Sequence, residues 1–178
     1  MIGRGSVAKF IATGLVAATL SACSGNLTDR SASLEGYTAE HIFERGEYEL
    51  ANGRSEDAAY YFAEIERLYP YSSWAKRSLI MQAYSFHSGK DYEDSRAAVQ
   101  RYIDFYPTDE DAAYAQYLLA LSYYDQIDEV GRDQGLTFQA LQSLRTVIEV
   151  YPDSEYATSA ILKFDLAFDH LAAKEMEI

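Results

Sequence analysis

The side chains best suited to metal binding or nucleophilic catalysis are few in this 178-residue chain, which has three histidines and one cysteine. His41, His87 and His170 fall on different predicted helices, and none belongs to an HExxH or similar motif. We interpret each histidine as a helix-surface or packing residue. The sequence also has no GxSxG motif, no glycine-rich phosphate loop and no CxxC pair. We therefore expect no metal site and no cofactor.

Carboxylates are abundant, with 28 acidic against 15 basic residues and a formal net charge of −13. The pairs Glu64/Glu66 and Asp109/Asp111 could in principle share acid–base chemistry, but no basic side chain is placed to orient them. Most acids are interpreted as the solvated face of helices. An acidic surface repels nucleic-acid backbones, so we expect no nucleic-acid partner. The chain is predicted not to be an enzyme.

The single cysteine, Cys23, directly follows an N-terminal segment that we interpret separately from the rest of the chain. Two basic residues, Arg4 and Lys9, precede or border an apolar run over 10–20, which is shorter than the roughly 20 residues that span a bilayer. This pattern is typical of a secretory signal peptide, here residues 1–22. Leu20-Ser21-Ala22-Cys23 resembles the bacterial lipobox. The resemblance implies cleavage before Cys23 and lipid on its thiol, and several acyl chains would give firm anchoring.

The residue after the cysteine is Ser24 and not Asp, which resembles an outer-membrane address in Gram-negative lipoprotein sorting. Residues 23–36 are polar and small and show no helical stripe. We interpret this segment as a flexible tether between the membrane and a folded domain over 37–178.

The domain is predicted from a repeated unit whose first copy is 38–70. It reads as two short helices separated by a turn at Asn52-Gly53 and ended by Tyr69-Pro70. The Tyr-Pro pair recurs at 106–107 and 151–152. A small residue stands twelve positions before each proline and a large apolar one eight before: Ala58, Ser95, Ala140 and Phe62, Val99, Leu144.

These offsets resemble the tetratricopeptide pattern, in which a small residue lets two helices approach closely. The predicted fold is all-α, a tetratricopeptide-like α-solenoid with repeats at about 38–70, 73–107 and 111–152 and one further helix at 154–175. The longer third repeat contains an enlarged loop, residues 125–135, which is either part of a working face or a tolerated surface loop. The last helix keeps an apolar stripe with no partner helix after it.

In tetratricopeptide arrays the first helix of each pair lines a concave wall. Aromatic side chains on such a wall suit extended peptides, because rings bury a large area at low rotamer cost. The alternative for each residue is that it packs between repeats. Counting from the start of each repeat places seven residues on this wall: Phe43, Glu47, Tyr84, His87, Tyr117, Leu121 and Tyr124.

Four further segments carry a family resemblance: Arg67-Leu68-Tyr69-Pro70, residues 113–117 (AYAQY), residues 151–157 (YPDSEYA) and residues 171–175 (LAAKE). Together with the lipobox and the tether, they resemble the BamD family of lipoproteins from the outer-membrane β-barrel assembly (Bam) machinery. The resemblance covers nearly the whole chain from Cys23 on. Members normally continue through about two further repeats, and the chain looks truncated by comparison.

The resemblance implies a non-enzymatic adaptor on the periplasmic face of the outer membrane of a Gram-negative bacterium. Its implied partners are unfolded outer-membrane β-barrel precursors at the front repeats and BamA, with other Bam subunits, at the rear repeats. Because the chain contains the front repeats, the resemblance supports precursor binding by this chain more directly than it supports docking onto BamA. The alternative hypothesis is a tetratricopeptide lipoprotein that scaffolds cell-wall or envelope-division enzymes, and the identity of the partners separates the two.

Overall fold

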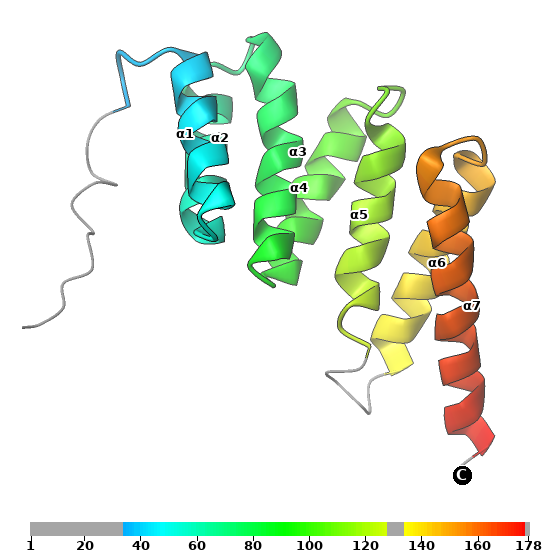
Figure 1. The fold of residues 1–178 in the computed structure, drawn as a ribbon. Helices are drawn as coiled ribbons and strands as arrows, with labels where there is room; N and C mark the ends of the chain where they lie inside the picture. Colours follow the sequence, from blue (N-terminus) through cyan, green and yellow to red (C-terminus); the bar gives the residue numbers. More distant parts are fainter. Residues whose placement is uncertain (1–33, 128–133, 177–178) are drawn as a thin grey trace, which may run out of the picture. The chain divides into compact units, whose positions relative to one another are not determined.

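The computed structural model describes residues 34–127 and 134–176, with side chains described as far as residue 173. Within these residues the fold is all-α and tetratricopeptide-like, as predicted, and the sole β feature is an isolated bridge between Glu35 and Tyr37. The predicted signal peptide, Cys23 and most of the tether lie outside the described residues, as does the middle of the 125–135 loop. The helices are α1 (Ala39–Ala51), α2 (Ser55–Leu68), α3 (Ser73–Ser88), α4 (Tyr92–Phe105), α5 (Ala112–Tyr124), α6 (Gln134–Val150) and α7 (Glu155–Met176) (Figure 1).

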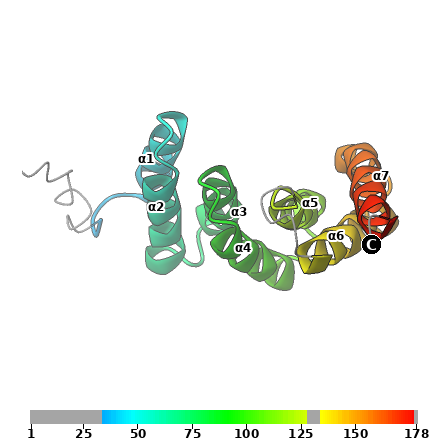
Figure 2. The same ribbon diagram turned by 90° about the horizontal axis from the view of Figure 1, so that it is seen from below.

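The helices stack in chain order, each contacting the next. The odd-numbered helices also contact one another, α1 with α3, α3 with α5 and α5 with α7, whereas no such contacts join α2, α4 and α6 in the described residues. Figure 2 shows α3, α5 and α7 on one side of the stack and α4 and α6 on the other. Because the odd helices pack closer together, their exposed side chains form the inner face of the stack.

The small and large positions predicted from the repeat are confirmed as its packing core. The small residues Ala58, Ser95 and Ala140 are fully buried, and so are the large residues Phe62, Val99 and Leu144. The Ser95 hydroxyl donates to the Ala83 carbonyl at 2.9 Å, so a polar side chain is tolerated between two helices.

The turns inside the first two repeats use the left-handed backbone in different ways. Gly53 has φ +74° between α1 and α2, as its predicted role as a helix stop requires. In the second repeat the left-handed residue is Lys90, with φ +67°, and Gly89 before it is right-handed. A Cβ on Gly89 would lie 3.2 Å from the Ser55 Cβ, so this glycine permits close approach to the start of α2.

The segment before α1 is part of the folded unit. Leu34 packs against the core of the first repeat, and the Tyr69 hydroxyl donates to the Tyr37 carbonyl. Gly36 between them has φ +106°, which a residue with a side chain rarely adopts. The predicted tether is thus too long at its end, because residues 34–36 are held on the repeat. The sequence shows no helical period there, and packing of a non-helical segment leaves no periodic signal.

Candidate peptide-binding face

Exposure along α3 identifies which side of each odd helix is open. Its exposed residues are Ser73, Arg77, Tyr84 and Ser88, and steps of 100° per residue place all four on one side of the helix. Since α3 is surrounded by α1, α2, α4 and α5, this side is the one that faces away from the neighbouring helices. We call the surface formed by such side chains the odd-helix face.

The neighbouring helices α5 and α7 continue the odd-helix face. On α5 the residues of this face are half-buried and recur at helical spacing: Tyr114, Tyr117, Leu121 and Tyr124. On α7 the residues of this face are exposed: Ser159, Leu162 and Leu166. Two contacts show which side of α7 faces α5: the Tyr156 ring stacks on that of Tyr117, and the Lys163 Nζ lies 4.5 Å from the centre of the Tyr124 ring. Leu162 and Leu166 are both 61% exposed, so the α7 part of this face is apolar.

Tyrosine rings join α5 to α7 across the face. The Tyr156 ring centre lies 5.4 Å from that of Tyr114 and 5.4 Å from that of Tyr117, the latter pair stacked at 25°. Burial, and then the nearby Tyr84, raise the pKa of Tyr114 to about 12. Burial also raises the pKa of Tyr117 and of Tyr156. These hydroxyls therefore stay protonated at neutral pH, where they can donate hydrogen bonds.

Four of the predicted wall residues lie on the odd-helix face. Tyr84 is 40% exposed and is the most accessible of them. Tyr117 is half-buried against Tyr156, and Tyr124 packs against the same buried cluster as Phe164 of α7, so both also serve the packing between helices. Leu121 is half-buried on α5 between them. Whether a peptide binds to these residues stays a prediction.

Phe43 is not on the face, which corrects the prediction for this residue. It is 1% exposed, with its ring centre 5.1 Å from Phe62 and 4.8 Å from Trp74. A peptide has no access to such a side chain. Gly53 and Gly89 are related by a repeat offset of 36 residues. The same offset makes Tyr48, not Phe43 or Glu47, the residue of the first repeat that is equivalent to Tyr84, and Tyr48 is exposed.

His87 lies at the end of α3 and is turned toward the end of α5. Its Nε2 is 3.2 Å from Asp125 Oδ2, and its ring meets that of Tyr92 edge-on at 5.3 Å. The distance suits an ion pair, but the nitrogen has no partner with hydrogen-bond geometry among the described residues. His87 thus belongs to the packing between α3, α4 and α5 more than to the open face.

Sequence reasoning missed Arg77, Tyr114, Leu162 and Leu166 as members of the face. Arg77 and Tyr84 are seven residues apart, as are Tyr114 and Leu121, so a two-turn spacing was the available signal. That signal shows which residues share a side of a helix, but not which side stays open after packing.

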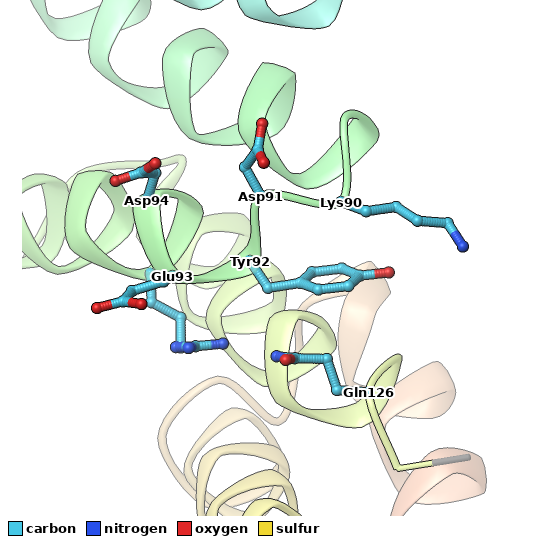
Figure 3. A pocket seen from close by; sticks show the side chains of 7 residues that line it. Lys90, Asp91, Tyr92, Glu93, Asp94 and Gln126 are labelled. Atoms are coloured by element: carbon cyan, nitrogen blue, oxygen red, sulfur yellow. The ribbon is translucent and has the colours of Figure 1, made fainter. Parts of the chain in front are cut away.

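A cavity of about 360 Å³ lies elsewhere, between the α3–α4 turn and the residues after α5. Figure 3 shows the Tyr92 side chain between Lys90 and Gln126, with Asp91, Glu93 and Asp94 at the start of α4. Arg96, on the same wall, already donates to the Ser122 carbonyl at 3.2 Å. The cavity has charges of both signs and contains none of the predicted wall residues.

Nowhere in 34–127 or 134–176 do three or more histidine, cysteine, aspartate or glutamate side chains gather closely enough to hold a metal ion. In the same ranges, no helix has the length and apolar character needed to cross a membrane.

Comparison with known proteins gives one consistent family. A family model described as an outer membrane lipoprotein, YfiO, matches residues 36–178. The chain is 41% identical over 177 residues to the outer membrane protein assembly factor BamD of Caulobacter vibrioides, covering 99% of this chain and 58% of that protein. It is 37% identical over 137 residues to BamD of Rickettsia prowazekii, covering 77% of this chain and 55% of that protein.

A third relative of the same name, from Pasteurella multocida, is 25% identical over 180 residues, covering 96% of this chain and 67% of that protein. The chain thus spans somewhat more than half the length of the two more similar relatives. The match runs through all the described helices and through the segments 67–70, 113–117 and 151–157 on which the resemblance rests. The chain therefore belongs to the YfiO family of outer membrane lipoproteins, which is the BamD family.

Proposed function

We propose that the chain is a lipid-anchored adaptor of the outer-membrane β-barrel assembly machinery. In this proposal it performs no catalysis. It binds unfolded barrel precursors on the odd-helix face and works beside BamA and other Bam subunits at the periplasmic side of the membrane. The family of the chain, and the name "outer membrane protein assembly factor" that its relatives carry, support a role in assembly at the outer membrane.

One observation carries the binding part of the proposal: aromatic and apolar side chains gather on the odd-helix face while remaining accessible. Tyr84 and the two α7 leucines are exposed, and the tyrosine hydroxyls beside them stay protonated. An unfolded segment presents apolar side chains and unpaired backbone groups together. Rings and hydroxyls on one surface can meet both needs.

The anchor part rests on the sequence around Cys23. A tether over 23–33, between the lipid site and Leu34, would keep the repeats close to the membrane without fixing their orientation. An adaptor held in this way meets precursors where they are inserted. Lipid attachment would also bring to the membrane a chain whose described residues, 34–127 and 134–176, include no spanning helix.

Partner identity tests the proposal. The full chain, extracted from its own envelope in mild detergent, should co-purify with barrel-assembly subunits and with unfolded outer-membrane precursors, identified by mass spectrometry. A matched preparation of a Tyr84→Ala variant should contain less co-purified precursor than the parent preparation and the same amount of barrel-assembly subunits. Recovery of cell-wall or division enzymes, with no barrel-assembly subunit, would instead support the scaffold hypothesis and contradict this one.

A further inference from the structure

The connections between successive repeats lie at one end of the helix stack and carry exposed apolar side chains. Figure 1 shows the α2–α3, α4–α5 and α6–α7 connections together at this end, where α1 also begins. Each connection has the same order of residues: an apolar residue that ends an even-numbered helix, then a tyrosine and a proline. We call this end the Tyr-Pro edge. Its exposed apolar side chains are Tyr37, Tyr71, Phe105 and Val150.

Packing within the stack does not account for the exposed side chains of the Tyr-Pro edge. Phe105 and Val150 end α4 and α6 and are 64% and 60% exposed, and Tyr71 is fully exposed. By contrast, Tyr106 of the second Tyr-Pro pair is half-buried, with its ring centre 5.3 Å from that of the buried Tyr102. Single exposed apolar residues are common on protein surfaces. A set at the same place in successive repeats indicates a contact with something outside the stack.

The Tyr-Pro edge is also the end at which the chain enters the folded unit. Leu34 packs on the first repeat, and the Tyr37 carbonyl accepts from the Tyr69 hydroxyl of the first Tyr-Pro pair. Residues 24–33 separate Leu34 from the proposed lipid site at Cys23, and fully extended they reach roughly 33–36 Å. The opposite end of the stack lies a further helix length away, about 20–25 Å for helices such as α1 and α3. A chain anchored at Cys23 therefore brings the Tyr-Pro edge to the membrane more readily than the opposite end.

We propose that the Tyr-Pro edge docks on a lipid surface with zwitterionic headgroups. In this arrangement the rings of Tyr37, Tyr71 and Phe105 and the side chain of Val150 lie among the headgroups, and the helices point away from the membrane. The inference rests on the lipid anchor of the proposed function, and it adds an orientation that the tether alone does not supply. The odd-helix face then runs away from the membrane and stays accessible from the side.

The kind and the distribution of the side chains favour a lipid surface. Tyrosine is enriched where a membrane meets water, because its ring lies at the level of the headgroups while its hydroxyl stays hydrated. At the end of α4, the Phe105 ring meets that of Tyr106 edge-on at 6.3 Å, so an apolar and an amphipathic ring stand together. A protein partner takes most of its binding energy from one central cluster. The side chains of the Tyr-Pro edge are instead distributed along the stack, which suits a flat, continuous surface.

The charges of the Tyr-Pro edge select the kind of lipid. Glu35, Glu110 and Asp153 are exposed there. The cations Arg67 and Lys76 lie near the same end, and both are paired with carboxylates. Anionic headgroups would be repelled by this balance of charges. A zwitterionic headgroup such as phosphatidylcholine has no net charge and presents its ammonium group outward, toward the carboxylates.

The test makes use of the single cysteine of the chain. Because lipid would occupy the Cys23 thiol, a second cysteine introduced on the surface can be labelled selectively with a fluorophore. Phe105→Cys and Val150→Cys place the label on the Tyr-Pro edge. Phe138→Cys is the matched control, because Phe138 is 53% exposed and lies near the start of α6, at the opposite end of that helix from Val150. Each lipidated full chain is reconstituted in phosphatidylcholine vesicles, with and without a nitroxide-bearing lipid that quenches nearby fluorophores.

We expect the nitroxide lipid to reduce the fluorescence of both edge labels and to leave the Phe138→Cys label unchanged, with all three variants as stable as the parent in thermal unfolding. Replacing part of the phosphatidylcholine by anionic phosphatidylglycerol should weaken the quenching at the edge. With Cys23 lipidated, equal quenching at the three positions, no quenching at either edge position, or quenching that requires the anionic lipid would overturn the inference alone. Absence of acyl groups on Cys23, measured by mass spectrometry, would contradict the anchor of the proposed function and the docking with it.

Discussion

At the scale of single residues, Asp109 connects three parts of the second and third repeats. Its carboxylate accepts from Lys76 Nζ at 2.6 Å, from the Tyr102 hydroxyl at 2.6 Å and from the Asp111 backbone N–H at 3.2 Å. Hydrogen bonds from Lys76, then Tyr102, hold the pKa of Asp109 below its usual value, and the bond to Asp109 raises the pKa of Lys76. The ionised carboxylate is therefore the form that the fold favours.

Asp109→Asn should lower the free energy of unfolding by about 1–2 kcal/mol at pH 7, because charge-assisted bonds become neutral ones at a partly exposed site. A lowered folded-state pKa stabilises the fold above the ordinary carboxyl pKa of about 4, and that stability is lost as pH falls through the folded value. The difference between parent and variant should therefore shrink on acidification. Urea unfolding at pH 7 and at about pH 2.5 measures both.

Asp104 serves as the control for this prediction, since it is exposed and its recorded bond is to Gln100 at 2.8 Å. Asp104→Asn should change stability little at either pH. A stability difference for Asp109→Asn that is the same at both pH values would show that the charge on this carboxylate is not what holds the network.

At the scale of helices, Gly46 sets how closely α1 and α2 approach. A Cβ at this position would lie 2.8 Å from Phe62 Cε1 and 2.9 Å from Cζ. Phe62 is fully buried and its ring also contacts Phe43 at 5.1 Å, so it has little room to move. The glycine is needed for this contact, although glycine is unfavourable inside a helix.

Gly46→Ala should therefore destabilise the protein by about 1–2 kcal/mol. So short a distance places the overpacking cost at the upper end of its usual range, about 2–3 kcal/mol, and the gain in helix propensity offsets roughly 1 kcal/mol of it. Gly135→Ala on α6 is the control, because Gly135 is exposed in a first helical turn and should become neutral or slightly stabilising. Thermal unfolding of both variants measures this. A Gly46→Ala protein as stable as the parent would mean that α1 and α2 can separate freely.

The helices and their packing core were predictable from sequence, whereas the open face was predictable only in part. Apolar spacing and the Tyr-Pro pairs predict helices, and the small residue at Ala58 or Ser95 predicts where two of them touch. The rotation of each helix about its axis depends on all its neighbours at once. Phe43 was therefore assigned to the wall but is core, and Arg77 was missed.

At the scale of the whole molecule, the proposed membrane attachment depends on one side chain outside the described residues. Cys23→Ser should leave the protein unlipidated and release it from outer membranes after a high-salt wash. The fold should persist, because the helical core that the structure describes is built from residues after position 33. Ser24→Ala should stay membrane-bound and serves as the control. Membrane fractionation checks the release, and thermal unfolding checks that the fold persists. A Cys23→Ser protein that remains with the washed membrane would contradict the lipid anchor.

The central claim is that barrel precursors bind on the odd-helix face, and two exposed tyrosines allow a direct test. Tyr84 lies on this face, whereas Tyr71, fully exposed, lies in the turn between α2 and α3. The measurement is the affinity of the full chain for a barrel-precursor C-terminal peptide, by titration, for the parent, Tyr84→Ala and Tyr71→Ala. We expect Tyr84→Ala to weaken binding roughly 2- to 12-fold, the value of one aromatic contact of about 0.5–1.5 kcal/mol, with Tyr71→Ala unchanged. Equal affinities for the parent and the folded Tyr84→Ala protein, or a loss confined to Tyr71→Ala, would contradict the claim.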